Sequence, residues 1–286
     1  MSAGARPRRS TLYMPGSNAR ALDKARGLDA DVLLFDLEDS VAPAAKQTVR
    51  GLVVAALREG GYGHRELIVR VNGAETEWGE DDIRAIADAG ADGILLPKVS
   101  DAKWCALPCA AWCMMETPGA MLRAAEIAGE IAAASPRLGA LVMGTTDLTQ
   151  ALGGRATPDR LAVLPSLGLC LLAARAHGLA ALDGVHMDLS DDAGLKAACQ
   201  QGRDLGFDGK TLVHPKTLAA ANQIFAPAAA DLEWARRVIE AHKDAEAKGA
   251  GVTLLDGKLI ESLHVTEAER LLALAAAIAE RGKGVA

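Results

Sequence analysis

Residues 32–60 read VLLFDLEDSVAPAAKQTVRGLVVAALREG, and this stretch decides the fold. It begins with Val32–Leu37, a continuous apolar run typical of a parallel strand that is covered on both faces. A helix-like segment, Ala44–Arg58, follows, and Gly60 stands where that helix should stop. The stretch therefore predicts one complete strand–helix unit.

The same unit recurs along most of the chain. Eight strand–helix units before residue 227 are typical of a barrel, so we expect an α/β fold, a (β/α)8 TIM barrel. An open doubly wound sheet is the alternative, but no Gly-x-Gly-x-x-Gly follows a strand and no P-loop motif is present. The expected strands are Thr11–Met14, Val32–Leu37, Leu67–Val71, Gly93–Pro97, Trp112–Glu116, Ala140–Met143, Leu182–His186 and Thr211–His214. The expected helices are Ala19–Ala25, Ala44–Arg58, Asp81–Ala89, Pro118–Ala133, Asp159–His177 and Asp191–Leu205. The glycines expected to end helices in a left-handed conformation are Gly27, Gly60, Gly90, Gly178 and Gly206.

The chain changes character after the barrel segment. Ala228–Ala247 predicts one long helix, Asp256-Gly257 predicts a two-residue hairpin turn, and Val265–Ala279 predicts a closing helix. This tail is too small for an independent core, so we interpret it as a C-terminal helix–hairpin–helix lid or oligomerisation segment. The expected domains are a catalytic barrel over residues 1–227 and the lid over residues 228–286.

Composition excludes several classes of function. Half of the 286 residues are hydrophobic, and the net charge at pH 7 is −6. This acidic balance argues against a nucleic-acid surface, which needs clustered Lys and Arg. The apolar runs are too short to cross a membrane, and no apolar signal segment follows Arg6, Arg8 and Arg9. We therefore expect a cytoplasmic protein with neither a nucleic-acid nor a membrane partner.

Polar residues follow most of the predicted strands. Catalytic side chains in barrels come from the carboxyl ends of the strands. Glu116 and Asp147 follow neighbouring strands, and an oxygen-rich site of this kind suits Mg²⁺, or Mn²⁺, better than zinc. Arg70 supplies a planar fork for a substrate carboxylate. The polar strand ends are Asp36–Asp39, Arg70–Asn72, Pro97-Lys98, Glu116–Pro118, Gly144–Asp147, Asp183 with Asp188, and His214-Pro215.

Some of these residues have a structural alternative. His214, before a proline, could cap the following helix instead of taking part in catalysis. Asp36 and Asp39 could be helix caps or ion-pair partners of Lys46 and Arg50.

Ordered motifs along the chain resemble the citrate lyase β-subunit-like family, within the HpcH/HpaI aldolase/citrate lyase superfamily. That family includes malyl-CoA and citramalyl-CoA lyases. The motifs follow the family's order and span nearly the whole chain. They are Arg9–Gly16, Asp36–Val41 with Lys46 and Arg50, Arg70–Asn72, Leu96–Lys98, Glu116–Gly119, Gly144–Leu148, Gly206–Lys210 and His214-Pro215.

The resemblance implies a Mg²⁺-dependent barrel in which Glu116 and Asp147 ligate the metal. Arg70 would bind the substrate's carboxylate or carbonyl oxygen, and Glu38 and Asp39 would hold metal-bound waters. It also implies an acyl-CoA or related carboxylate substrate and a homotrimer or hexamer. The residues that we expect to contact CoA phosphates, with a solvated surface charge as the alternative for each, are Arg9, Lys24 and Lys46.

The tail departs from the family pattern. Gly257–Glu261 matches a lid motif that ends in a catalytic aspartate, but here the carboxylate is one methylene longer. A displacement near 1 Å can lower a rate by roughly a hundredfold. Glu261 is the residue that we expect to donate a proton to the enolate carbon that forms when a carbon–carbon bond of the substrate is cleaved. The alternatives are a lid that no longer acts in catalysis and an exposed glutamate on a packing helix.

The leading hypothesis is a Mg²⁺-dependent carbon–carbon lyase. It would cleave or form a carboxylate-bearing 3-hydroxy-acyl-CoA thioester, such as malyl-, citramalyl- or citryl-CoA, by a retro-Claisen reaction. The alternatives are a thioesterase on the same substrates, a CoA-independent 2-keto acid aldolase, and a non-catalytic regulatory subunit that only the Glu261 change favours.

Overall fold

The structure is a computed structural model that describes residues 6–99, 102–105, 107, 109–134 and 139–283. The chain divides into two compact units. One unit is Arg8–Phe225, and the other contains the segment that follows Phe225.

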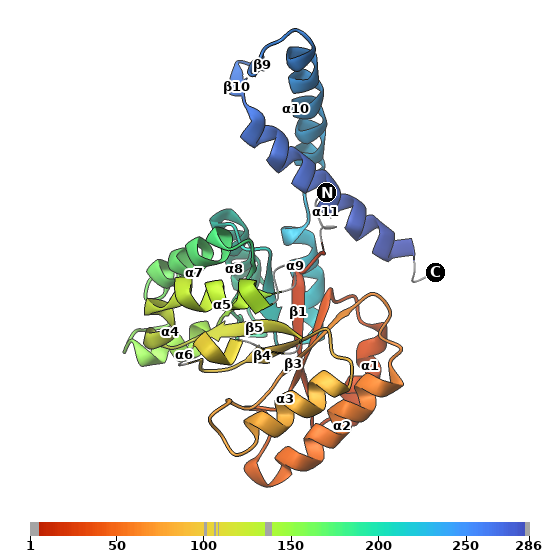
Figure 1. The fold of residues 1–286 in the computed structure, drawn as a ribbon, viewed down its shortest axis with the longest axis vertical. Coiled ribbons are helices and arrows are strands. Elements are labelled where there is room, and N and C mark those ends of the chain that lie inside the picture. The colour runs from red at the N-terminus through yellow and green to blue at the C-terminus, as the bar shows by residue number, and fades with distance from the viewer. Residues whose placement is uncertain (1–5, 100–101, 106, 108, 135–138, 284–286) are drawn as a thin grey trace. The chain divides into compact units, whose positions relative to one another are not determined.

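Eight parallel strands form a closed barrel within the described residues, with each strand beside the next in sequence and β8 beside β1. This arrangement confirms the predicted (β/α)8 barrel. The strands are β1 (Ser10–Pro15), β2 (Val32–Asp36), β3 (Glu66–Arg70), β4 (Gly93–Leu96), β5 (Ala110–Met115), β6 (Ala140–Met143), β7 (Ala180–Asp183) and β8 (Gly209–Leu212). The helices are α1 (Ala19–Lys24), α2 (Lys46–Glu59), α3 (Gly79–Asp88), α4 (Pro118–Leu122), α5 (Ala124–Ala134), α6 (Thr145–Ala151), α7 (Leu164–Ala176), α8 (Asp192–Leu205) and α9 (Leu218–Phe225). In Figure 1, helices such as α2, α3, α5 and α7 lie outside the labelled strands β1, β3, β4 and β5.

The barrel wall separates two apolar layers. Val32 and Leu34 belong to the cluster inside the barrel, which also contains the fully buried Trp112. Leu33 and Phe35 belong to the cluster between the wall and the helices. Because both faces are covered, successive residues of a strand are all apolar, which explains the continuous apolar runs of the sequence.

Two predicted helices have different bounds in the structure. The helix predicted over residues 118–133 is divided into α4 and α5, because Arg123 has a non-helical backbone (φ −110°, ψ 18°). The helix predicted over residues 159–177 begins only at Leu164. Pro165 stands in its first turn, where a missing N–H leaves no hydrogen bond unmade. The helices α6 and α9 were not predicted.

The glycine predictions held at four of five positions. Gly60, Gly90, Gly178 and Gly206 have positive φ angles of 70°, 83°, 68° and 109°. The prediction for Gly27 was wrong, because that glycine ends a 3-10 turn and has no positive φ.

The C-terminal unit is a helical hairpin with a small β-hairpin between its helices. It consists of α10 (Ala229–Ala247), β9 (Thr253–Leu255), β10 (Lys258–Ile260) and α11 (Ser262–Lys283). Asp256 and Gly257 both have positive φ, 51° and 76°, which a type I′ hairpin turn requires and which the Asp-Gly pair predicted. Val238 and Ile260 are fully buried in the small core of this unit.

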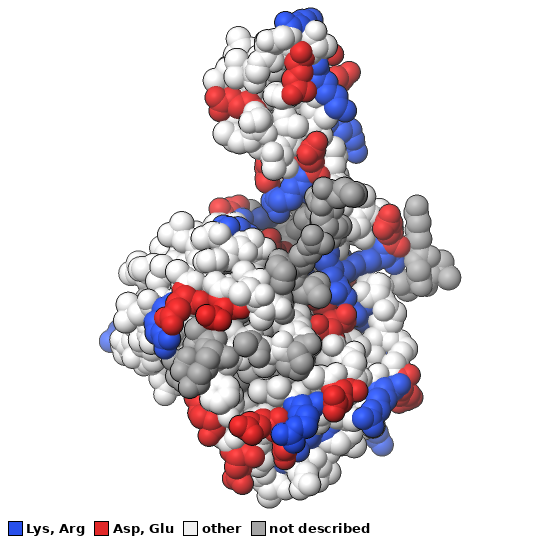
Figure 2. All heavy atoms as spheres, in the orientation of Figure 1, with Lys and Arg blue, Asp and Glu red and all other residues white. Residues whose placement is uncertain are grey.

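Charges of both signs are mixed on one face of the molecule (Figure 2). In the face drawn in Figure 2, Lys and Arg side chains are interspersed with Asp and Glu and form no continuous basic area. Among the described residues, no helix is both long enough and apolar enough to span a bilayer.

Candidate active site

Charged side chains gather at the carboxyl ends of β2 to β6. Asp36 and Arg70 are the last residues of their strands, and Glu116 directly follows β5. Glu116 leads straight into α4, because Thr117 caps that helix and Pro118 occupies its first turn. Asp147 lies in the first turn of α6, where a carboxylate interacts favourably with the helix dipole. The ends of parallel strands meet at one rim, so these groups form one site.

Arg70 is buried beneath this rim and is already bound to a carboxylate. Its Nε and Nη2 atoms donate to the two oxygens of Asp36, at 2.7 and 2.9 Å. Its guanidinium lies over the ring of Tyr13, at 5.1 Å from the ring centre. Burial alone would raise the pKa of Asp36, but the hydrogen bonds and charge of Arg70 outweigh it and lower that pKa. The planar fork predicted for a substrate carboxylate is thus committed to Asp36.

Asp36 also shapes the loop that follows β2. Its carboxylate accepts backbone N–H groups of Glu38, at 3.0 Å, and of Ser40, at 3.3 Å. These bonds curl the loop back over the strand end. The helix cap predicted as an alternative role for Asp36 is wrong, because α2 has Ala45 at its N-cap and no side-chain cap there. The carboxylate of Asp36 instead holds the loop and directs Glu38 and Asp39 toward the rim.

Glu38, Asp39, Arg70 and Lys98 form a closed ring of ion pairs, the charge ring. Arg70 Nη1 contacts Glu38 Oε2 at 2.9 Å and Asp39 Oδ2 at 3.4 Å. Lys98 Nζ contacts the remaining oxygens, Glu38 Oε1 and, at 3.3 Å, Asp39 Oδ1. Each carboxylate therefore joins both cations through separate oxygens. Such an arrangement fixes the side chains more firmly than isolated surface pairs do.

Lys98 also contacts Glu116 through its backbone. The N–H of Lys98 donates to Glu116 Oε1 at 2.7 Å, and Lys98 has a left-handed backbone with φ 47°. On the other side, Gly144 lies so close that an added Cβ would be 2.3 Å from Glu116 Cβ. Glu116 is thus held between the β4 loop and the start of α6.

The electrostatics of Glu116 fit a cation site. Burial first, and then the negative charges of Glu38 and Asp147, raise the pKa of Glu116 to about 7. The charge of Arg70 and the N–H of Lys98 offset only part of this effect. The buried Glu116 therefore lies beside the half-buried Asp147 without full compensation of its negative charge. A divalent cation would supply it.

The donor set suits a hard metal ion. Mg²⁺ is usually held by one or two carboxylates, with water and substrate oxygens completing its coordination. The described part of the chain contains no cluster of three or more His, Cys, Asp or Glu that could hold a metal. Glu116 and Asp147 fit the predicted magnesium site.

A family model supports the same interpretation of the chain. The model of the HpcH/HpaI aldolase/citrate lyase family matches residues 9–107 and 108–215, which include the whole rim. The chain belongs to the HpcH/HpaI aldolase/citrate lyase family. This confirms the resemblance found in the motifs.

Relatives of this chain include a thioesterase and a citrate lyase subunit. The (3S)-malyl-CoA thioesterase of Cereibacter sphaeroides is 53% identical over 285 residues, covering 98% of both chains. The citrate lyase subunit beta of Escherichia coli is 37% identical over 287 residues, covering 94% of both chains.

Solved structures of Mycobacterium tuberculosis proteins are also similar. The protein CitE in complex with magnesium, acetoacetate and coenzyme A is 30% identical, with a TM-score of 0.76, covering 96% of this chain and 99% of that chain. A citrate lyase beta subunit complexed with oxaloacetate and magnesium is 31% identical, with a TM-score of 0.66. It covers 77% of this chain and 98% of that chain.

The structure places two predicted CoA contacts of this family member away from the rim. Arg9 directly precedes β1, at the amino ends of the strands, and its guanidinium binds both oxygens of the buried Asp31 at 2.8 and 2.9 Å. Lys24 is exposed in the last turn of α1, which leads back to the amino end of β2. Because Glu116 and Asp147 lie at the carboxyl ends, neither position favours a contact with a thioester bound at this rim, and the two CoA contacts stay predictions.

Lys46 does lie near the rim, but its ammonium group is buried. It donates to the backbone carbonyls of Leu37 and Glu38, at 2.9 and 2.7 Å. It therefore holds the β2–α2 loop, and the prediction of a CoA contact is corrected to this structural role. Arg50 pairs with Asp82 at 2.5 Å instead of Asp36 or Asp39.

His214 and Glu261 both lie next to the start of a helix. Nδ1 of His214 accepts the backbone N–H of Lys216 at 3.1 Å, which supports the helix-cap alternative. Glu261 belongs to the C-terminal unit and directly precedes α11, where its backbone N–H donates to Nδ1 of His264 at 3.1 Å. Its catalytic role stays a prediction.

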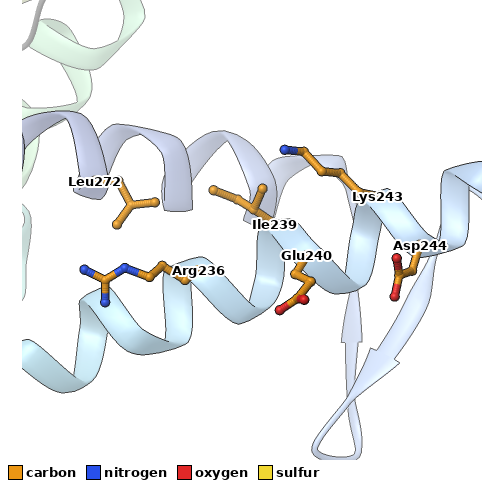
Figure 3. Close-up of a pocket in the computed structure, with 6 residues that line it drawn as sticks. All are labelled: Arg236, Ile239, Glu240, Lys243, Asp244 and Leu272. Carbon is orange, nitrogen blue, oxygen red and sulfur yellow. The ribbon is translucent and has the colours of Figure 1, made fainter.

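The C-terminal unit has a hollow of its own. A cavity of about 350 Å³ opens along α10 and α11, with Ile239 and Leu272 as apolar lining (Figure 3). The other side chains in Figure 3 are charged residues of both signs on α10. No residue of the rim lines this hollow. The residues that line it are Arg236, Ile239, Glu240, Lys243, Asp244 and Leu272.

Metal binding should depend on pH through Glu116. Its pKa is raised to about 7, so below pH 7 a metal ion must displace a proton, and affinity falls with pH. We expect Mg²⁺ to bind roughly tenfold more weakly at pH 6 than at pH 8, as measured by titration calorimetry. In the metal-free protein, folding stability depends on pH in the opposite direction. This group's contribution to stability is present below pH 4.5 and is lost as pH rises through about 7. A Mg²⁺ affinity independent of pH would contradict the assignment.

The fit between Gly144 and Glu116 gives a steric test. In Gly144→Ala the new Cβ would lie 2.3 Å from Glu116 Cβ and 2.8 Å from Oε2, so Glu116 must move. We expect at least a roughly tenfold loss of Mg²⁺ affinity. Gly119→Ala is the matched control, because nothing lies within 4 Å of its added Cβ. Equal affinities in the two variants would refute this role of Gly144.

Proposed function

We propose that this chain is a Mg²⁺-dependent thioesterase that hydrolyses a carboxylate-bearing 3-hydroxy-acyl-CoA of the malyl-CoA type. The observation that carries the proposal is the 53% identity to (3S)-malyl-CoA thioesterase over 98% of both chains. The identity to citrate lyase subunit beta is lower, at 37%. This changes the order of the hypotheses drawn from the sequence, which placed the carbon–carbon lyase first.

Glu116 and Asp147 are the proposed ligands of Mg²⁺. The incomplete charge compensation of the buried Glu116, with the half-buried Asp147 nearby, supports this assignment, as do the magnesium complexes of similar proteins. When bound, Mg²⁺ would polarise the substrate oxygen and offset negative charge at the reacting centre. Glu38 and Asp39, fixed by the charge ring, face the same rim and would orient water there.

Hydrolysis needs a base for the attacking water. Glu38 is held closely through both oxygens, whereas the contacts of Asp39 are longer, 3.3 and 3.4 Å, and its side chain is 58% exposed. Asp39 is therefore our candidate base. Its carboxylate takes the water proton as the oxygen attacks the thioester carbon. The carbon–sulfur bond then breaks, and Asp39 gives the proton that it took to the departing CoA sulfur, so that the products are CoA thiol and the carboxylic acid. General-base catalysis of this kind contributes roughly 10²–10⁴ in rate.

A carbon–carbon lyase is the second candidate, favoured by the similarity to citrate lyase subunit beta. Retro-Claisen cleavage requires a proton donor placed accurately at the enolate carbon. Hydrolysis requires no such donor. The glutamate at position 261, where the family resemblance implies an aspartate, therefore bears on the lyase reaction more than on the thioesterase reaction.

The products formed from malyl-CoA distinguish the two reactions. With Mg²⁺ and purified chain, we expect free CoA thiol and malate in equal amounts. Acetyl-CoA and glyoxylate without free thiol would overturn the thioesterase in favour of the lyase. In the same assay we expect Asp147→Asn to abolish turnover and Asp39→Asn to lower kcat by roughly 10²–10⁴. Full activity of Asp147→Asn would reject the metal assignment.

A further inference from the structure

Lys98 is held in an unusual conformation by the site itself. Among the described residues, only Lys98, Arg160 and Asp256 combine a side chain with a positive φ. Left-handed backbone is unfavourable for a lysine and persists where its surroundings fix it. Here the backbone N–H is bound to Glu116 and the ammonium to the charge ring. The unfavourable backbone of Lys98 therefore lies between Glu116, the proposed metal ligand, and the charge ring.

The ammonium of Lys98 has a donor left for a ligand. A lysine has three N–H donors, and those of Lys98 have two acceptors in the charge ring, Glu38 and Asp39. Its side chain is 49% exposed, so a third donor can face solvent at the rim. Arg70 is only 10% exposed and already contacts three carboxylates, and Lys46 is buried against carbonyls. Of these three cations, Lys98 is the accessible one.

The charge of the rim makes such a donor necessary for an anionic substrate. Within the described rim, the five carboxylates outnumber the three cations, Arg70, Lys98 and the buried Lys46. The carboxylates are those of Asp36, Glu38, Asp39, Glu116 and Asp147. An approaching carboxylate would be repelled unless a positively charged donor received it. A hydrogen bond from an ammonium to a carboxylate is about twice as strong as one between neutral groups.

We propose that Lys98 binds the free carboxylate of the thioester substrate and so sets the preference for acyl groups that carry one. This rests on the proposed function, because it assigns a residue to one part of that substrate. The left-handed backbone has a role in this arrangement, since one residue orients Glu116 through its N–H and presents its ammonium at the rim.

The test compares two thioesters that differ only at this group. Malyl-CoA and 3-hydroxybutyryl-CoA share chain length and hydroxyl group, but the second has a methyl group in place of the carboxylate. For Lys98→Met, we expect the ratio of kcat/KM between them to fall by roughly 10- to 100-fold, the value of one charged hydrogen bond. Lys98→Arg should keep most of the preference. An unchanged ratio, or an equal loss on both thioesters, overturns the proposal.

Metal binding separates this role from an indirect one. Removing a cation makes the rim more negative, so Lys98→Met should bind Mg²⁺ at least as tightly as the wild type in calorimetry. A loss of Mg²⁺ binding would mean that Lys98 acts through Glu116, and would overturn the proposal. Lys98→Gly is the second variant, because glycine adopts φ 47° without strain, and the same change in preference is expected.

Malate binding at equilibrium tests the role of Lys98 separately from the proposed thioesterase reaction. Malate binding in the presence of Mg²⁺ requires no turnover, and we expect it to weaken roughly 10- to 100-fold in Lys98→Met. A wild-type protein that releases no thiol from malyl-CoA refutes the thioesterase. Malate binding that depends on Lys98 would still support the inference, and malate binding equal in both proteins would refute it.

Discussion

The buried ion pair between Arg70 and Asp36 is the interaction on which the site depends. It joins the last residues of β2 and β3 through two hydrogen bonds, at 2.7 and 2.9 Å. Removing one partner of such a pair leaves an uncompensated buried charge, which costs about 3–5 kcal/mol. The loop after β2 is curled onto Asp36, and the remaining Nη of Arg70 holds Glu38 and Asp39. One pair thus sets the positions of three carboxylates.

The barrel brings these charges together, and their balance gives the site its chemistry. Lys98 closes the charge ring from β4 and, through its backbone, reaches Glu116 beyond β5. Burial and the neighbouring carboxylates raise the pKa of Glu116 to about 7, which indicates that the rim is short of positive charge. A divalent cation and the ammonium of Lys98 would compensate different parts of this deficit. In this view, metal binding and recognition of an anionic substrate are properties of one electrostatic arrangement.

Much of the fold, and the placement of Glu116 and Asp147 at one rim, could be predicted from the sequence. Continuous apolar runs such as Val32–Leu37 mark strands covered on both faces, and the carboxyl ends of such strands point to Glu116 and Asp147. The partners of the cations could not be predicted. Whether Arg70 meets Asp36 or a substrate depends on side-chain geometry across two strands. The left-handed backbone of Lys98 has no signature in its sequence, although its position after a strand was visible. Lys46 looked accessible because backbone carbonyls, its actual partners, leave no pattern in a sequence.

A crystal structure with Mn²⁺ would test the metal pair most directly, because manganese suits the same oxygen ligands and is identified by its anomalous scattering. The account predicts one strong anomalous peak between Glu116 and Asp147, with an oxygen of each about 2.1 Å away and the contacts of Arg70 with Asp36 unchanged. A peak held by Asp36 or Glu38 instead, or no peak at this rim at saturating Mn²⁺, would contradict it.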